Sequence, residues 1–229
     1  LEIAAAPGGA PGDAAAGTGT QTPEPAFRDP GFSELGVTAS ELLSTLPVKG
    51  RAPKTGVDRD EQFGRAWIDV DLNGCDTRND VLLRDLTDTV VDDRCRVLTG
   101  TLEDPFTGAR IEFVRGEHTS PLVQIDHIVA LSDAWQKGAQ ALTHDARVRF
   151  ANDPLNLIAV DGPSNAAKSD SDAASWLPPQ RAFRCEYVAR QVSVKAAYAL
   201  WVTEAERSAI AGVLRSCPEQ PAYAAQLQP

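Results

Sequence analysis

The sequence contains no methionine, only three histidines, and no long uninterrupted apolar run among its 229 residues. A membrane-spanning helix needs about 20 consecutive apolar residues, and even the apolar segment from Ala196 to Val202 is shorter than that. We therefore expect no membrane span. The chain begins at Leu1 without a methionine, as it would after removal of a signal peptide, so we expect a secreted protein.

Positive charge is also scarce. Lys and Arg number 22 against 32 Asp and Glu, so the formal net charge is -10 at pH 7, and the pI is near 4.8. Proteins that bind nucleic acid mainly by neutralising phosphates usually carry the opposite balance. This argues against a strongly basic nucleic-acid binder. It leaves open a hydrolase that binds its substrate transiently, because a bound divalent cation adds local positive charge.

The four cysteines form an even set, and none stands in the C-x-x-C spacing of a zinc knuckle or a redox pair. Two disulfides are the preferred interpretation. Four cysteines allow three pairings, of which the simplest joins sequence neighbours, Cys75 with Cys95 and Cys185 with Cys217. Disulfides would place the protein in an oxidising compartment. The alternative is four reduced cysteines buried in a cytosolic protein.

Composition divides the chain into three parts. Residues 1–30 are mostly Ala, Gly, Pro and Thr with almost no large apolar side chain, so nothing there offsets the entropy lost on ordering. We predict a flexible leader over 1–30, one domain over 31–217 and a C-terminal tail over 218–229. With 42% hydrophobic residues the chain can bury one substantial core.

Local patterns predict an α+β fold in which helices dominate. Two T-x-x-E capping boxes, Thr38 with Glu41 and Thr203 with Glu206, indicate helix starts. Between them we predict a helix after Thr77, a hairpin over 94–116, a buried strand over 123–131, a helical insertion over 132–153, a short strand over 156–160, a helix that stops at the prolines 178–179, and a long helix over 181–202.

One segment carries the residues for chemistry. A strand contains Asp126 and His127, a second strand begins at Asn156, and the next helix opens with 162–168. Hydrolysis of a phosphodiester with one metal ion needs a base for the water, a hard cation for the leaving oxygen, and a rigid frame. A neutral imidazole supplies the base at physiological pH. Carboxylate and amide oxygens suit Mg²⁺ or Mn²⁺.

These residues resemble a known motif. Asp126-His127, then Asn156, then Asn165 and Lys168 in N-x-x-K, resemble the catalytic motif of HNH (His-Me finger, ββα-metal) endonucleases, in the branch that uses D-H, N and N-x-x-K. The upstream segment NGCDTRNDVL is similar to a group of secreted bacterial HNH nucleases, which extends the resemblance over 63–217. The resemblance implies a ββα-metal finger, with its core at about 122–177, embedded in a mostly helical single domain with two disulfides.

The resemblance also implies roles for these residues. His127 would be the general base, and Asp126 and Asn165 would bind the metal, Mg²⁺ most readily and Mn²⁺ as the alternative. Asn156 would brace the loop between the strands, and Lys168 would contact a phosphate or the transition state. The expected enzyme is a secreted endonuclease that cuts DNA, or RNA as the alternative, with little sequence preference.

Other expectations concern the surface. Arg78, Arg181 and Arg184 are predicted contacts for the phosphate backbone, with salt pairs on helix surfaces as the alternative. His118 and His144 stand in polar segments and are expected at the surface.

Two other functions stay open: a non-catalytic secreted nucleic-acid-binding module on the same fold, and a secreted structural or adhesion domain. We assume a monomer.

Overall fold

The computed structural model describes residues 31–225, so the leader predicted for 1–30 lies outside the described residues. The strands are β1 (Phe32–Thr38), β2 (Thr87–Val91), β3 (Val97–Glu103), β4 (Arg110–Val114), β5 (Val123–His127), β6 (Leu157–Asp161) and β7 (Pro221–Ala225). The helices are α1 (Ala39–Thr45), α2 (Arg59–Phe63), α3 (Thr77–Asp85), α4 (Leu131–Gln136), α5 (His144–Ala151), α6 (Gly162–Lys168), α7 (Arg184–Ala197) and α8 (Glu204–Leu214), with short 3₁₀ turns between some of them.

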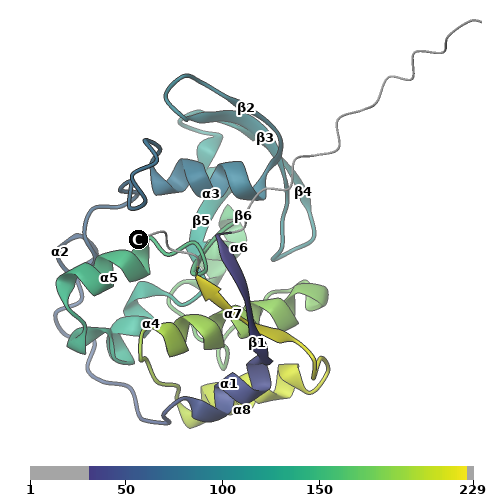
Figure 1. The fold of residues 1–229 in the computed structure, drawn as a ribbon. Helices are drawn as coiled ribbons and strands as arrows, with labels where there is room; N and C mark the ends of the chain where they lie inside the picture. Colours follow the sequence, from purple (N-terminus) through teal and green to yellow (C-terminus); the bar gives the residue numbers. More distant parts are fainter. Residues whose placement is uncertain (1–30, 226–229) are drawn as a thin grey trace, which may run out of the picture.

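The strands form three small antiparallel sheets, β1–β7, β2–β3–β4 and β5–β6, and the β2–β3–β4 sheet lies at one end of the molecule beside α3 (Figure 1). The predicted mixture of helices and strands is confirmed. The predicted order of strand, strand and helix at the candidate site is also present, because β5 pairs with β6 and α6 follows β6 directly. In residues 31–225 no helix has both the length and the apolar character needed to cross a membrane.

Local signals fixed the helix starts. Thr38 and Thr203 each accept a hydrogen bond from the main chain of a glutamate three residues later, and that glutamate bonds back, as both capping boxes predict. The helical insertion over 132–153 is divided, because Gly138 takes φ 126° and separates α4 from α5. The predicted long helix ends at Ala197, earlier than expected, where Ala199 turns into the left-handed region with φ 51°.

The hairpin of β5 and β6 lies where three clusters of buried apolar side chains meet. Ile128 belongs to a cluster with α1, α7 and α8. Val129 belongs to a cluster with α2, α4 and α5. Ile125 belongs to a cluster with α3 and the β2–β3–β4 sheet. Full burial of one such side chain stabilises the fold by about 1.5–3 kcal/mol, so the hairpin is held from several sides at once.

The described part of the predicted C-terminal tail, residues 218–225, contains a strand. This strand, β7, pairs with β1 from the other end of the described chain. Tyr223 of β7 packs edge-on against Phe32 of β1, with ring centroids 5.4 Å apart, and its main-chain N–H donates to Ser193 Oγ at 2.9 Å. The strand sequence is short and rich in alanine, so its formation depends on these distant partners and local periodicity could not reveal it.

Both disulfides form with the simplest of the three pairings. Cys75 joins Cys95 and so ties the segment before α3 to the turn between β2 and β3. Cys185 joins Cys217 and ties α7 to the end of α8. No cysteine of the chain is left free. Each bridge closes a loop whose restriction in the unfolded chain stabilises the protein by about 3 kcal/mol.

Candidate active site

A cavity of about 410 Å³ opens beside the end of β5. Its lining brings together Asp126 and His127 from β5, Asn165 from α6 and Arg59 from α2. Neighbouring residues on a strand normally point to opposite faces. Because Asp126 and His127 are the last two residues of β5, both side chains still border one cavity.

His127 is held in one orientation by the main chain. Its Nε2 lies 2.9 Å from the carbonyl oxygen of Ala151. A carbonyl can only accept, so Nε2 carries the proton and donates, and Nδ1 is the basic nitrogen. Burial lowers the pKa of His127 to about 3, and the positive charges of Arg59 and Lys168 act in the same direction. The imidazole is therefore neutral at physiological pH.

Asp126 combines one paired oxygen with one unpaired oxygen. Its Oδ1 accepts from Lys168 Nζ at 3.0 Å. Its Oδ2 is buried and has no hydrogen-bond partner among the described residues. Burial raises the pKa of Asp126, and the ammonium of Lys168 only partly counters that effect. A buried carboxylate oxygen without a partner is costly unless a further ligand completes it.

The two asparagines of the motif, Asn165 and Asn156, have different places at the site. The side-chain N–H of Asn165 donates to Gln124 Oε1 at 2.9 Å, which turns its amide oxygen away from Gln124. Asn156 is fully buried and does not line the cavity. Its Oδ1 accepts from the main-chain N–H of Val129 at 2.8 Å, so it fixes the chain just after His127. This contact lies where the predicted brace was expected.

We expected Lys168 to contact a phosphate, but its side chain does not line the cavity. Its side chain is fully buried. Besides Asp126, its Nζ donates to the main-chain oxygen of His127 at 2.8 Å. One ammonium therefore holds both residues at the end of β5 in place.

The three predicted phosphate contacts lie elsewhere. None of Arg78, Arg181 and Arg184 lines this cavity. Arg78 donates to the main-chain oxygen of Val123 at 3.1 Å, and Arg184 donates to that of Pro178 at 2.7 Å. Arg181 is exposed. His118 and His144 are exposed, as predicted.

Sequence reasoning missed two residues of the site. Arg59 lines the cavity from the first position of α2. The indole of Trp67 lies nearly parallel to the imidazole of His127, with an interplanar angle of 14° and ring centroids 6.4 Å apart. Both stand in the segment 46–76, which has little regular structure, so no periodic pattern could place them near β5.

The donor set fits a hard divalent cation. The unpartnered Oδ2 of Asp126 and the amide oxygen of Asn165 are the protein atoms that would hold it, with water in the other positions. Within residues 31–225 no group of three or more His, Cys, Asp or Glu side chains could hold a metal. A cation bound here would therefore keep much of its hydration, as Mg²⁺ usually does.

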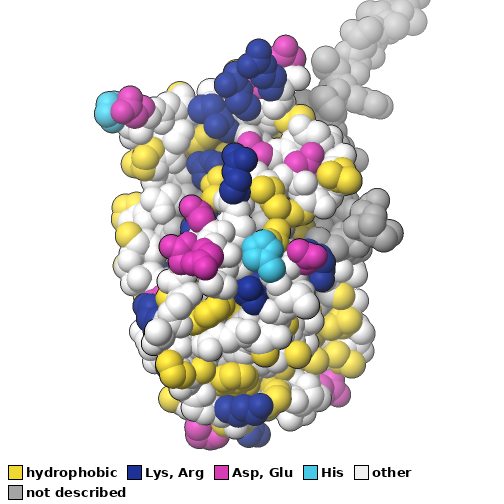
Figure 2. Space-filling model, turned by 90° about the vertical axis from the view of Figure 1, so that its left-hand side faces the viewer, with side chains coloured by type: hydrophobic (Ala, Val, Ile, Leu, Met, Phe, Trp, Pro, Cys, Tyr) yellow, Lys and Arg dark blue, Asp and Glu magenta, His cyan; other side chains and the backbone are white. Residues whose placement is uncertain are grey.

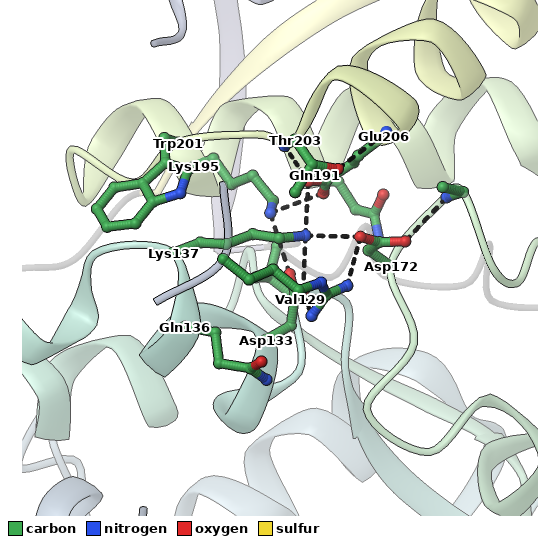
Figure 3. A network of polar contacts seen from close by, with 12 residues as sticks. Val129, Asp133, Gln136, Lys137, Asp172, Gln191, Lys195, Trp201, Thr203 and Glu206 are labelled. Atoms are coloured by element: carbon green, nitrogen blue, oxygen red, sulfur yellow. Dashed lines mark hydrogen bonds and ion pairs between the residues drawn. The ribbon is translucent and has the colours of Figure 1, made fainter. Parts of the chain in front are cut away.

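A second group of buried charges forms a network of its own (Figure 3). Lys137, directly after α4, contacts Asp133, Asp172 and Glu206 at 2.6–2.7 Å. Lys195 of α7 contacts Asp133 and Glu206 at 3.1 and 2.7 Å. Burial lowers the pKa of Lys137, but the charges of Asp133 and Glu206 outweigh this and raise it overall. The network joins α4, α7 and α8 to the segment after α6.

Comparison with known proteins places this geometry in a family. The model of the family described as GmrSD restriction endonucleases, C-terminal domain, matches residues 76–213. The chain belongs to this family. The matched segment contains β5, β6 and α6, with Asp126, His127, Asn165 and Lys168, whereas Arg59 and Trp67 precede it. The description of the GmrSD C-terminal family connects the chain with nucleases.

One related protein is similar to this chain over most of the length of both. It is an uncharacterized secreted protein of Arthroderma benhamiae, 39% identical over 198 residues, which cover 86% of this chain and 92% of that protein. No solved structure matches the chain. The bacterial branch that the motif suggested stays a prediction.

Proposed function

We propose that the protein is a secreted, metal-dependent endonuclease of the HNH type, whose β5, β6 and α6 serve as a ββα-metal finger. The observation that carries the proposal is a neutral histidine and a buried carboxylate oxygen without a partner on one cavity. Membership of the GmrSD C-terminal family supports nuclease chemistry. The two disulfides and the secreted relative support an extracellular location.

In the proposed reaction, His127 accepts a proton from water at Nδ1, while the bond from Nε2 to Ala151 fixes the ring. The ammonium of Lys168 holds Asp126 and the main chain of His127, so its proposed role is positioning. Asp126 and Asn165 would hold the cation, which supplies positive charge for the phosphate and the leaving oxygen. Asn156 keeps the chain after His127 in place.

We propose DNA as the substrate, RNA as the alternative, and little sequence preference. Charge segregates on the face that carries α2 and α5: Lys and Arg side chains gather in its upper part, at the height of α3 and the β2–β3–β4 sheet (Figure 2). Such a band lets an acidic protein approach a polyanion on one side. Among residues 31–225 the longest helix, α7, is largely buried, so α7 cannot enter a groove as a recognition helix.

Plasmid nicking with Mg²⁺, with Mn²⁺ and with a chelator tests the proposal. Wild type should cut with metal and not with chelator. His127→Ala should lower the rate by about 10² to 10⁴, the usual contribution of a general base. His144→Ala, which removes an exposed histidine, is the matched control and should cut at the wild-type rate.

Two outcomes would overturn the proposal. If His127→Ala cuts as fast as the wild type, the mechanism is wrong. If the wild type binds DNA but cuts neither DNA nor RNA with any of the metals, the protein is the non-catalytic binding module that the sequence left open.

A further inference from the structure

Arg59 has an unusual position for an exposed arginine. It begins α2, a helix that Asp58 caps by accepting from the main-chain N–H of Glu61. Phe63, at the other end of α2, is 1% exposed and anchors the helix in the core. The Arg59 side chain is thus carried on a fixed element and lines the cavity that contains Asp126 and His127.

Two other cations near this cavity, Lys168 and Lys54, are occupied. Lys168 pairs with Asp126 at 3.0 Å. Lys54 pairs with Asp170, which lies on the cavity lining. For the guanidinium of Arg59, by contrast, the part of the chain from 31 to 225 provides neither an ion pair nor a hydrogen bond, and its charge is available to a ligand.

Trp67 holds this guanidinium beside the site. The central carbon of the guanidinium lies over the indole ring of Trp67, 5.6 Å from its centre. The same indole is nearly parallel to the imidazole of His127. Trp67 has φ 61°, a conformation that residues with side chains rarely adopt and that persists where the surroundings enforce it. The indole therefore connects the free cation to the proposed base.

We infer that Arg59 binds a non-bridging oxygen of the nucleic-acid phosphate at this cavity, and that Trp67 is the positioning residue that holds its guanidinium there. The inference rests on the proposed function and identifies the residue that contacts the substrate backbone. A guanidinium presents planar N–H donors that match phosphate oxygens. In a chain with a net charge of -10, one unpaired arginine at the site is a strong local determinant of where a phosphate binds.

Binding of a short DNA duplex, followed by fluorescence anisotropy in chelator across a salt series, tests the role of Arg59. Arg59→Ala should weaken binding about tenfold. It should also reduce the slope of log affinity against log salt by about one unit, because one phosphate contact is lost. Arg59→Lys should keep the slope. Arg207→Ala, an exposed arginine of α8, is the matched control and should change neither quantity.

Substitution of Trp67 separates charge from positioning. Trp67→Leu removes the aromatic face and keeps the arginine, so affinity should fall about twofold to fivefold with an unchanged salt slope. Trp67→Phe should restore part of the loss. A role for Trp67 in folding alone would lower the melting temperature in both variants and leave the affinity of the folded protein unchanged, which would overturn the positioning role.

The nicking assay in Mg²⁺ supplies the second comparison, in which Arg59→Ala should raise KM more than it lowers kcat. If the wild type cuts DNA and Arg59→Ala shows wild-type affinity, salt slope and KM, the inference about Arg59 is wrong and the proposed function stands. If the wild type neither binds nor cuts nucleic acid, the proposed function itself has failed.

Discussion

Two buried groups of charged side chains in this protein differ in whether every carboxylate oxygen has a partner. In the network around Lys137 and Lys195, the buried Asp133 Oδ1 and Glu206 Oε1 lack hydrogen bonds, yet each lies 2.7 Å from an ammonium. At the end of β5, Asp126 Oδ2 has no hydrogen bond among the described residues, and the carboxylate's ion pair with Lys168 is formed through Oδ1 at 3.0 Å.

This difference in pairing indicates separate roles for the network around Lys137 and Lys195 and for Asp126. Buried charges that compensate one another hold elements together, because removing one partner leaves an uncompensated charge in the interior. A buried oxygen left without a partner costs stability in the free protein and becomes useful once a ligand completes it. We therefore assign the network to the fold and the end of β5 to the function. Substitutions in each group test this contrast.

Lys137→Met should have the largest effect on stability. It leaves Asp133, Asp172 and Glu206 with too little positive charge in the interior, so the free energy of unfolding should fall by about 3–5 kcal/mol. Urea unfolding at pH 7 measures it. Lys54→Met, which breaks an exposed pair with Asp170, is the control and should cost less than about 1 kcal/mol. Equal costs would remove the contrast between buried and exposed pairs.

Lys168→Met should have a smaller effect on stability, about 1–3 kcal/mol. Lys168 serves a single carboxylate, Asp126, whose pKa burial already raises in the folded state. A carboxyl group whose pKa is raised in the folded state lowers the free energy of unfolding when pH is above that raised pKa. This cost disappears once pH falls below the pKa of the unfolded state, about 3.9. The cost of Lys168→Met should therefore shrink between pH 7 and pH 4. A cost that stays constant with pH would show that Asp126 does not take up the proton.

Asp80→Asn should have the smallest effect, and of opposite sign. Burial, together with the charges of Asp71 and Asp69, raises the pKa of Asp80 to about 6, although a hydrogen bond from Asn73 partly counters this. The carboxylate therefore destabilises the fold above pH 6 and costs nothing below its unfolded pKa of about 3.9.

Because Asp80 is partly exposed, solvent screening leaves about 1 kcal/mol to be gained by Asp80→Asn at pH 7, and the gain should vanish near pH 4. Unfolding in chelator, so that no divalent cation neutralises the neighbouring carboxylates, gives the comparison. The control is Asp145→Asn, whose side chain is 88% exposed. A gain that is equal at both pH values would contradict the pKa of about 6.

Much of the fold could be predicted because its signals are local. The two capping boxes fixed the starts of α1 and α8, and the apolar runs around Ile125 and Ile158 predicted the two strands of the site. The sequence left three disulfide pairings open, and the simplest of them, between sequence neighbours, is the one that forms. The motif residues Asp126, His127 and Asn165 do meet at one cavity.

The rest depends on contacts between distant parts of the chain. The pairing of β1 with β7 joins the two ends of the described chain. The place of Arg59 follows from the packing of Phe63 into the core, and that of Trp67 from its contact with His127. The burial of Lys168 could not be read from N-x-x-K, because the sequence shows the spacing and not which face of α6 meets β5.

The dependence of the nicking rate on metal concentration tests the central claim most directly, because Asp126 Oδ2 and the Asn165 amide oxygen are proposed to hold the cation and His127 is not. Asn165→Ala should raise the half-saturating concentration of Mg²⁺ or Mn²⁺ about tenfold or more, and it should recover part of its nicking rate at high metal concentration. His127→Ala should keep the wild-type half-saturating concentration and should stay slow at every metal concentration. An Asn165→Ala variant with the wild-type metal dependence, or a His127→Ala variant rescued by excess metal, would contradict the account.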